Sequence, residues 1–195
     1  MMPYARLRRK RAGNVDAGWG DDPDDRRSTT GYNFVAWGGP ITWRSVKQKS
    51  TALSSCEAEY MAASEAGKEA VWLRRLYQSD LGYEDVSVIT HGDLSEKEHH
   101  GAKPLTIFDD NQGCIQLSRN PVSAKTSKHI AIRYHFIRER VMDGTLKLAK
   151  IDTKLNTADI LTKATRRGTF IFLRDKLLKP AEKPKWRRKG TGAGF

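Results

Sequence analysis

Four acidic side chains stand at places where a folded chain could bring them together: Asp16, Glu59, Asp110 and Asp159. Asp16 and Asp110 end segments patterned as strands, whereas Glu59 and Asp159 lie near the starts of two predicted helices. In an open α/β sheet, functional groups gather at strand ends and at neighbouring helix N-termini. Clustered carboxylates repel one another unless a cation lies between them, and an all-oxygen set suits Mg²⁺ or Mn²⁺. Two such ions could support phosphodiester cleavage.

The spacing alone leaves a simpler role open for each of these carboxylates. An aspartate in a turn or at a helix start usually caps the backbone. Glu57 has capping-box spacing with Ser54, so it competes with Glu59 as the functional residue of that helix. Asp109 and Asp110 are neighbours at the end of one strand, where successive side chains point to opposite faces. Only one of the two can therefore enter a shared site.

The elements that must position these residues follow from the hydrophobic pattern. Alternating β-branched and aromatic residues predict strands, and apolar residues at steps of three and four predict helices. One strand is expected to end near Asp16. Further strands are expected over 30–39, 40–45, 104–110 and 145–151, and helices over 54–82, 111–121, 128–144 and from Asn156 as N-cap. This order predicts an α/β layered domain with a mixed sheet.

Charge and composition limit the partners and the compartment. Lys and Arg outnumber Asp and Glu by 35 to 23, a formal charge of +12, which fits either a polyanionic partner or basic tails on an ordinary soluble protein. The two cysteines, Cys56 and Cys114, lie in apolar periodic segments and are expected to be buried free thiols. No apolar run approaches the roughly 18 residues of a membrane span. We expect an intracellular protein of the cytoplasm or nucleus, neither secreted nor membrane-bound.

Five segments, in order along the chain, resemble one known family. They are "DAGWGDDPDDRRSTTGYNF", "ITWRSVKQKSTALSSCEAEYMAASEAGKEAVWLRRL", "DDNQGCIQLSRNP", "SKHIAIRYHFIRERVMDGTLKL" and "NTADILTK". Together they resemble the ribonuclease H domain of copia-type long-terminal-repeat retrotransposon Pol polyproteins. The resemblance implies a ribonuclease H-like fold, a mixed five-stranded sheet flanked by helices. It also implies that the chain is a fragment of a polyprotein, or a relic coding sequence.

The resemblance assigns the family's metal-binding and catalytic carboxylates to Asp16, Glu59, Asp110 and Asp159. Glu59 is chosen over Glu57 because an apolar pair follows it. Asp110 is chosen over Asp109 because it directly precedes Asn111, so Asp109 is expected to face away and to cap. The implied reaction is two-metal hydrolysis of the RNA strand of RNA–DNA hybrids, with Mg²⁺ or Mn²⁺. Gly18 stands where the family usually has a second aspartate, which lies outside this metal set.

Candidate nucleic-acid contacts follow from the same segments. They are Asn111, Gln112, Lys128, His129, Arg133 and His135. Two simpler readings stay open: Asn111 could only cap the following helix, and the charged face of the helix over 128–144 could only be solvated. The expected partners are an RNA–DNA hybrid and the reverse transcriptase and integrase segments of the parent polyprotein.

The expected organisation has three parts. Residues 1–12 form a basic N-terminal arm, 13–166 the ribonuclease H-like domain with a polar insertion at 84–103, and 167–195 a C-terminal helix fragment and basic tail. The alternative function is a catalytically inactive nucleic-acid-binding relic of the domain. It is favoured by the arginines that precede Asp16, because arginine is poorly placed in a buried central strand.

Overall fold

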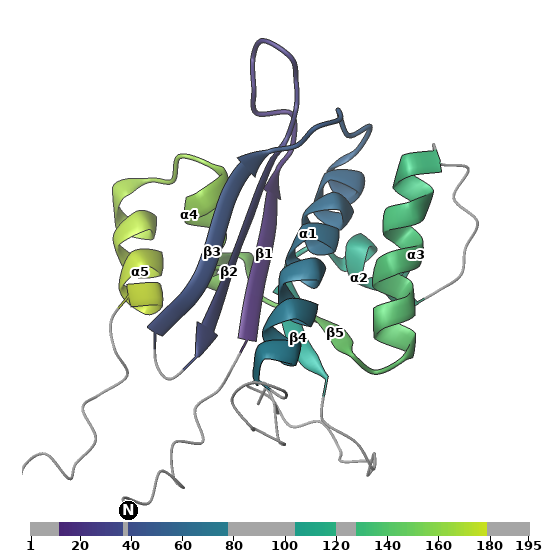
Figure 1. The fold of residues 1–195 in the computed structure, drawn as a ribbon. Coiled ribbons are helices and arrows are strands. Elements are labelled where there is room, and N and C mark those ends of the chain that lie inside the picture. The colour runs from purple at the N-terminus through teal and green to yellow at the C-terminus, as the bar shows by residue number, and fades with distance from the viewer. Residues whose placement is uncertain (1–11, 37–38, 78–103, 120–127, 179–195) are drawn as a thin grey trace, which may run out of the picture.

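The computed structural model describes residues 12–36, 39–77, 104–119 and 128–178 (Figure 1). Its five strands form one sheet in the order β3-β2-β1-β4-β5. β1 pairs antiparallel with β2 and parallel with β4, β2 pairs antiparallel with β3, and β4 pairs parallel with β5. The strands are β1 (Ala12–Gly18), β2 (Thr29–Ala36), β3 (Gly39–Lys47), β4 (Leu105–Asp109) and β5 (Leu146–Lys150). The predicted mixed five-stranded sheet is confirmed.

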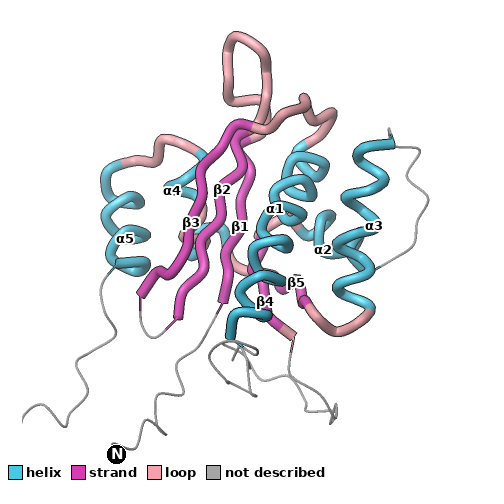
Figure 2. Tube along the Cα trace, in the orientation of Figure 1, coloured by secondary structure: helices cyan, strands magenta, loops and turns pink. Residues whose placement is uncertain are grey.

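Helices cover both faces of the sheet (Figure 2). One face carries α1 (Ser55–Arg75), α2 (Gln112–Arg119) and α3 (Lys128–Met142). The other face carries α4 (Asp159–Thr162) and α5 (Arg167–Leu178), and a 3₁₀ turn, η2 (Thr153–Leu155), leads from β5 into α4. None of the helices within these described ranges is both long and apolar enough to cross a membrane.

The first strand is short but central. Within the described residues β1 runs over Ala12–Gly18 and pairs with β2 on one side and β4 on the other. Val15 and Ala17 belong to the buried core under α1. Asn14 and Asp16 alternate with them on the opposite face, where both side chains are buried. The strand therefore holds Asp16 in place although the sequence before it is strongly basic.

The helix α1 starts as the sequence predicts. The Ser54 hydroxyl accepts the N–H of Glu57 at 3.1 Å, and the Glu57 carboxylate accepts the N–H of Leu53 at 2.9 Å. Ser54 thus caps the first turn, while Glu57 accepts from the residue before the N-cap and not from Ser54 itself. Small residues then allow close packing, since a Cβ on Gly67 would lie 2.7 Å from a methyl carbon of Ile137 in α3. The helix start and its burial against the sheet together fix the position of Glu59.

Two local expectations are corrected. The N-cap residue of α4 is Ala158 rather than Asn156, and it makes no side-chain cap hydrogen bond because alanine has no acceptor. Both cysteines are free, but only Cys114 is buried, whereas Cys56 is partly exposed at the start of α1.

The predicted insertion at 84–103, nearly all of the basic arm and the tail beyond 178 lie outside the described residues. The domain boundaries therefore stay a prediction. α5 falls within the segment 167–195 that was expected to hold a C-terminal helix.

Candidate metal centre

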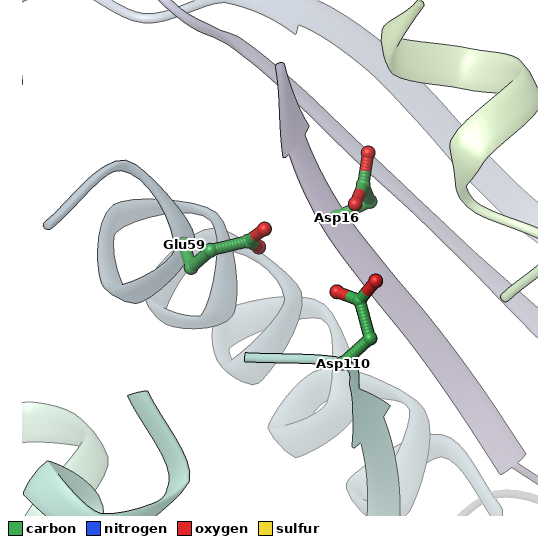
Figure 3. A group of neighbouring side chains, drawn as sticks. All are labelled: Asp16, Glu59 and Asp110. Atoms are coloured by element: carbon green, nitrogen blue, oxygen red, sulfur yellow. The ribbon is translucent and has the colours of Figure 1, made fainter. Parts of the chain in front are cut away.

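Three of the four predicted carboxylates converge at one edge of the sheet. Asp16, Glu59 and Asp110 each offer an oxygen, and these oxygens lie within 4.8 Å of one another (Figure 3). The parallel pairing of β1 with β4 sets Gly13 opposite Ile107, and the same register continued along both strands brings Asp16 level with Asp110. Glu59 reaches the pair from the second turn of α1. Tertiary pairing therefore joins residues that are far apart along the chain.

The Glu59 carboxylate is held in an environment that opposes its negative charge. Burial, followed by the charges of Asp109 and Asp16, raises the pKa of Glu59 to about 10. Its Oε2 is buried and has no hydrogen-bond partner among the described residues. A buried carboxylate without a partner is costly unless it is protonated or bound by a cation. The group thus fits a divalent ion with oxygen ligands, such as Mg²⁺ or Mn²⁺.

Asp109 and Asp110 take different places, as strand alternation predicts. Asp109 lies outside the three-carboxylate group and accepts the N–H of Asn111 at 2.7 Å, a local turn that precedes α2. It does not face solvent, however, because its side chain is fully buried. Burial above all raises the pKa of Asp109 to about 7. Asp109 therefore caps and also adds negative charge beneath the site.

Asp159 does not join the tight group but lies beside it. Its side chain is buried in the first turn of α4, where burial and the charge of Asp16 raise the pKa of Asp159 to about 6. The ammonium of Lys163 lies 3.3 Å from Oδ1 of Asp159 and 3.6 Å from Oδ2 of Asp16. The Thr162 hydroxyl donates to the same Oδ2 of Asp16. Lys163 and Thr162 thus link the fourth carboxylate to the first.

Sequence reasoning did not identify Lys163 or Thr162. One signal was present, because Asp159 and Lys163 are four residues apart and such residues share a helix face. Their contact with Asp16, on a strand almost 150 residues earlier, had no signal in the sequence.

The segment around α4 is fixed to the sheet by buried polar contacts. The Asn156 amide donates to the carbonyl oxygen of Val15 at 2.9 Å, and its Oδ1 accepts the N–H of Ala158 at 3.2 Å. The Thr157 hydroxyl donates to Oδ1 of Asn33 at 3.1 Å. Asn156 and Asn33 are both fully buried. These bonds place Asp159 next to β1.

The predicted nucleic-acid contacts are only partly described. Asn111 does cap α2, because its Oδ1 accepts the N–H of Cys114 at 3.0 Å. The side chains of Gln112 and His135 are exposed, and Arg133 is partly exposed. Lys128 and His129 lie in the first turn of α3, and their side chains are outside the described part of the chain. Their contact with nucleic acid stays a prediction.

Gly18 has a structural reason for lacking a side chain. The carboxylate of Asp21 occupies the space in which a Cβ on Gly18 would stand, and the carbonyl oxygen of Thr162 borders the same space. An aspartate at position 18 would have to displace Asp21.

The strand order, the strand directions, the helices on both faces and the acidic group at the β1–β4 edge define a ribonuclease H-like domain. Sequence comparison finds the retrovirus-related Pol polyprotein from transposon TNT 1-94 of Nicotiana tabacum, 44% identical over 81% of this chain and 10% of that protein. The retrovirus-related Pol polyprotein from transposon RE1 of Arabidopsis thaliana is 37% identical over 80% of this chain and 9% of its own length. The chain is homologous to one segment of the Pol polyproteins of copia-type transposons, so the predicted resemblance is confirmed.

The chain spans about a tenth of the length of these curated relatives. No protein-family model matches it. Among solved structures, LC11-RNase H1, isolated from compost by a metagenomic approach, is similar with a TM-score of 0.49 and 16% identity. That alignment covers 78% of this chain and 92% of that one.

Proposed function

We propose that this chain is a ribonuclease H that hydrolyses the RNA strand of RNA–DNA hybrids. One observation carries the proposal: Asp16, Glu59 and Asp110, from three separate elements, present oxygens within 4.8 Å of one another. Like charges at this separation are stable only when a cation or a proton compensates them. The homology to Pol polyproteins supports a reaction on nucleic acid.

The residues present fit divalent metal binding. Asp16, Glu59 and Asp110 would hold one ion, and Asp16 with Asp159 would hold a second, since Asp16 faces both sets. Mg²⁺ or Mn²⁺ at these places would supply Lewis acidity for the attacking water and for the leaving 3′ oxygen. The buried, unpartnered oxygen of Glu59 supports this fit.

The chain's own residues supply orientation. Asp16 is held by the hydroxyl of Thr162, and the rigid strand β1 fixes its backbone. Glu59 is directed by the capped first turns of α1, and Asp110 by the end of β4. Sites held on helices and strands in this way keep their geometry without substrate. The 2′-hydroxyl that distinguishes RNA from DNA would be read near Glu59.

The polar and basic side chains at the start of α2 and on the first half of α3 would bind the phosphates of the hybrid. Gln112 on α2 and Arg133 and His135 on α3 present exposed or partly exposed polar side chains, and Lys128 and His129 begin α3. Asn111 would contribute with the part of its side chain not used in capping α2. The formal charge of +12 supports a polyanionic partner. Reverse transcriptase and integrase segments of a parent polyprotein are proposed as further partners.

The inactive alternative loses the feature that favoured it. It depended on a first strand too basic to hold Asp16, but β1 lies at the centre of the sheet with Val15 and Ala17 in the buried core. Asp16 is buried and paired. The catalytic reading is therefore the better supported of the two.

A cleavage assay with the full chain tests the proposal. Purified protein with Mg²⁺ or Mn²⁺ is expected to cut the labelled RNA strand of a hybrid, and Asp110→Asn is expected to lower the rate by at least about 100-fold, since it removes charge from the metal site. Asp143→Asn, in the turn before β5, is the matched control and should retain activity. Hybrid binding by well-folded protein without any cleavage would overturn the proposal and favour the inactive relic.

A further inference from the structure

Lys163 lies between two carboxylates of the site rather than in open solvent. Its ammonium is 3.3 Å from Asp159 and 3.6 Å from Asp16, both of whose side chains are buried. The lysine side chain itself is 42% exposed. One end of the site thus already contains a positive charge supplied by the chain.

The two sides of Asp16 differ in this respect. Toward Glu59 and Asp110, Asp16 shares a group of three carboxylates whose oxygens lie within 4.8 Å. Toward α4, it accepts a hydrogen bond from Thr162 and faces Lys163 and Asp159. Lys150, which also approaches the site, donates to the backbone carbonyl of Asp110 and not to its carboxylate. The group of Asp16, Glu59 and Asp110 therefore needs an external cation. On the α4 side, Lys163 already supplies the positive charge between Asp16 and Asp159.

We propose that the ammonium of Lys163 occupies the second cation position in the protein free of nucleic acid. The free protein then binds one divalent ion tightly, at Asp16, Glu59 and Asp110. The pair Asp16–Asp159 becomes available to a second ion when a phosphate of bound nucleic acid draws Lys163 away. Lys163 is in this sense a positioning residue that couples metal occupancy to substrate. The inference rests on the proposed function.

The side chain of Lys163 suits such an exchange. Lys163 is the C-cap residue that follows α4, with extended backbone angles, and its ammonium reaches both Asp159 and Asp16. A lysine ammonium is a compact charge on a flexible four-carbon stem, and it binds carboxylate or phosphate without fixed geometry. Partial exposure leaves a route to solvent and to a bound phosphate. An arginine would hold the carboxylates as a rigid fork instead.

Counting bound Mn²⁺ tests the proposal without relying on activity. Electron paramagnetic resonance and calorimetry are applied to the full chain without nucleic acid. Wild type is expected to bind one Mn²⁺ tightly. Its affinity for a second Mn²⁺ should be at least roughly tenfold weaker than that of Lys163→Met. The variant lacks the positive charge that lies 3.3 Å from Asp159 and 3.6 Å from Asp16, so these two carboxylates become free to bind the ion. Lys163→Arg keeps the positive charge, so its second site should bind Mn²⁺ at least as weakly as the second site of wild type. Lys68→Met, which removes a lysine paired with Glu65 on the surface of α1, is the matched control and should match wild type.

Hybrid binding in EDTA gives a second measurement, since no cleavage occurs there. Lys163→Met should bind the hybrid several-fold more weakly than Lys68→Met. Equal affinity of wild type and Lys163→Met for both Mn²⁺ ions would overturn the role of Lys163 while leaving the nuclease proposal intact. Absence of Mn²⁺ binding in every protein would overturn the metal centre itself, and both proposals with it.

Discussion

Two acidic regions of this molecule show opposite electrostatic behaviour. In the metal centre, Glu59 is buried beside other carboxylates, and burial is the first cause that raises its pKa to about 10. In the turn between β1 and β2, Asp22 is partly exposed, Asp25 is exposed, and both pair with Lys47. A hydrogen bond from Lys47 is the largest cause that lowers the pKa of each. The charged form of a carboxylate is therefore favoured in the turn and disfavoured in the metal centre.

The difference lies in where the compensating charge and donors come from. Around the turn, the chain supplies them: Lys47 gives the cation, and Oδ1 of Asp22 accepts the N–H groups of Asp24 and Asp25 at 2.9 and 3.3 Å. At Glu59 the chain supplies burial and further negative charge, while Thr162 and Lys163 reach the group only at Asp16. A carboxylate group built this way retains a site for an external cation, whereas the turn has no such need.

The largest expected effect is stabilisation by a divalent ion at one region only. Mg²⁺ at about a hundred times its Kd should add about 2.7 kcal/mol to the free energy of unfolding, which raises Tm by roughly 5–10 °C in a chain of this size. Glu59→Gln and Asp110→Asn should abolish this rise in thermal melts, because they remove ligand charge. Asp22→Asn and Asp25→Asn, in the turn, should preserve it. A comparable Mg²⁺ response in all four variants would show that the two regions do not differ.

The next effect is an opposite pH dependence. The pKa of Glu59 is raised from its ordinary 4.5 to about 10, so the folded state binds more protons than the unfolded state between these values. Stability without metal should therefore fall as pH rises through this window. The pKa values of Asp22 and Asp25 are lowered, so their contribution is present above about 3.8 and is lost as pH falls below it.

Urea unfolding in EDTA at pH 6 and pH 9 measures the first of these trends. The midpoint should be lower at pH 9 in wild type, and Glu59→Gln should reduce the difference because it removes the titrating group. A wild-type midpoint that rises between these two pH values would contradict the account of Glu59.

A smaller effect is expected from the contact that anchors α4 beside the metal centre. Asn156→Ala removes the donor to Val15 and the acceptor for Ala158, both in a fully buried place, and should cost about 1–3 kcal/mol of unfolding free energy. Asp152→Ala removes an exposed cap that accepts the N–H of Lys154, and it should cost less. Urea titrations of both variants compare them, and equal costs would argue against a buried anchor.

The smallest expected effect is at the exposed turn. Lys47→Met should raise the pKa values of Asp22 and Asp25 toward their ordinary 3.8, because it removes the first-ranked cause of their depression. Side-chain NMR titration of the two carboxyl carbons measures this shift. The urea midpoint near neutral pH should barely change, since exposed ion pairs contribute little to stability. A large loss of unfolding free energy in Lys47→Met would contradict the view that its ion pairs with Asp22 and Asp25 contribute little to stability.

Patterns within short stretches were sufficient for much of the fold. Ser54 and Glu57 predicted the start of α1, where the Ser54 hydroxyl accepts the N–H of Glu57 and the Glu57 carboxylate accepts the N–H of Leu53. Alternating residues predicted β2, β3 and β5, and the strand expected over 104–110 is β4, which ends one residue earlier than expected, at Asp109. The site was harder, because the arginines before β1 argued against the very strand that carries Asp16. Local charge was misleading there, since β1 pairs with both β2 and β4 and buries Asp16.

The sequence by itself determined the local elements, the caps and the set of acidic residues that could take part in chemistry. Only the tertiary structure decided that Asp16, Glu59 and Asp110 lie together, that Asp159 is joined to Asp16 through Lys163, and that Asp109 is buried beneath them. The reason is physical. Caps and periodicity depend on neighbours a few residues apart, whereas the register of β1 against β4 depends on burial of the whole sheet.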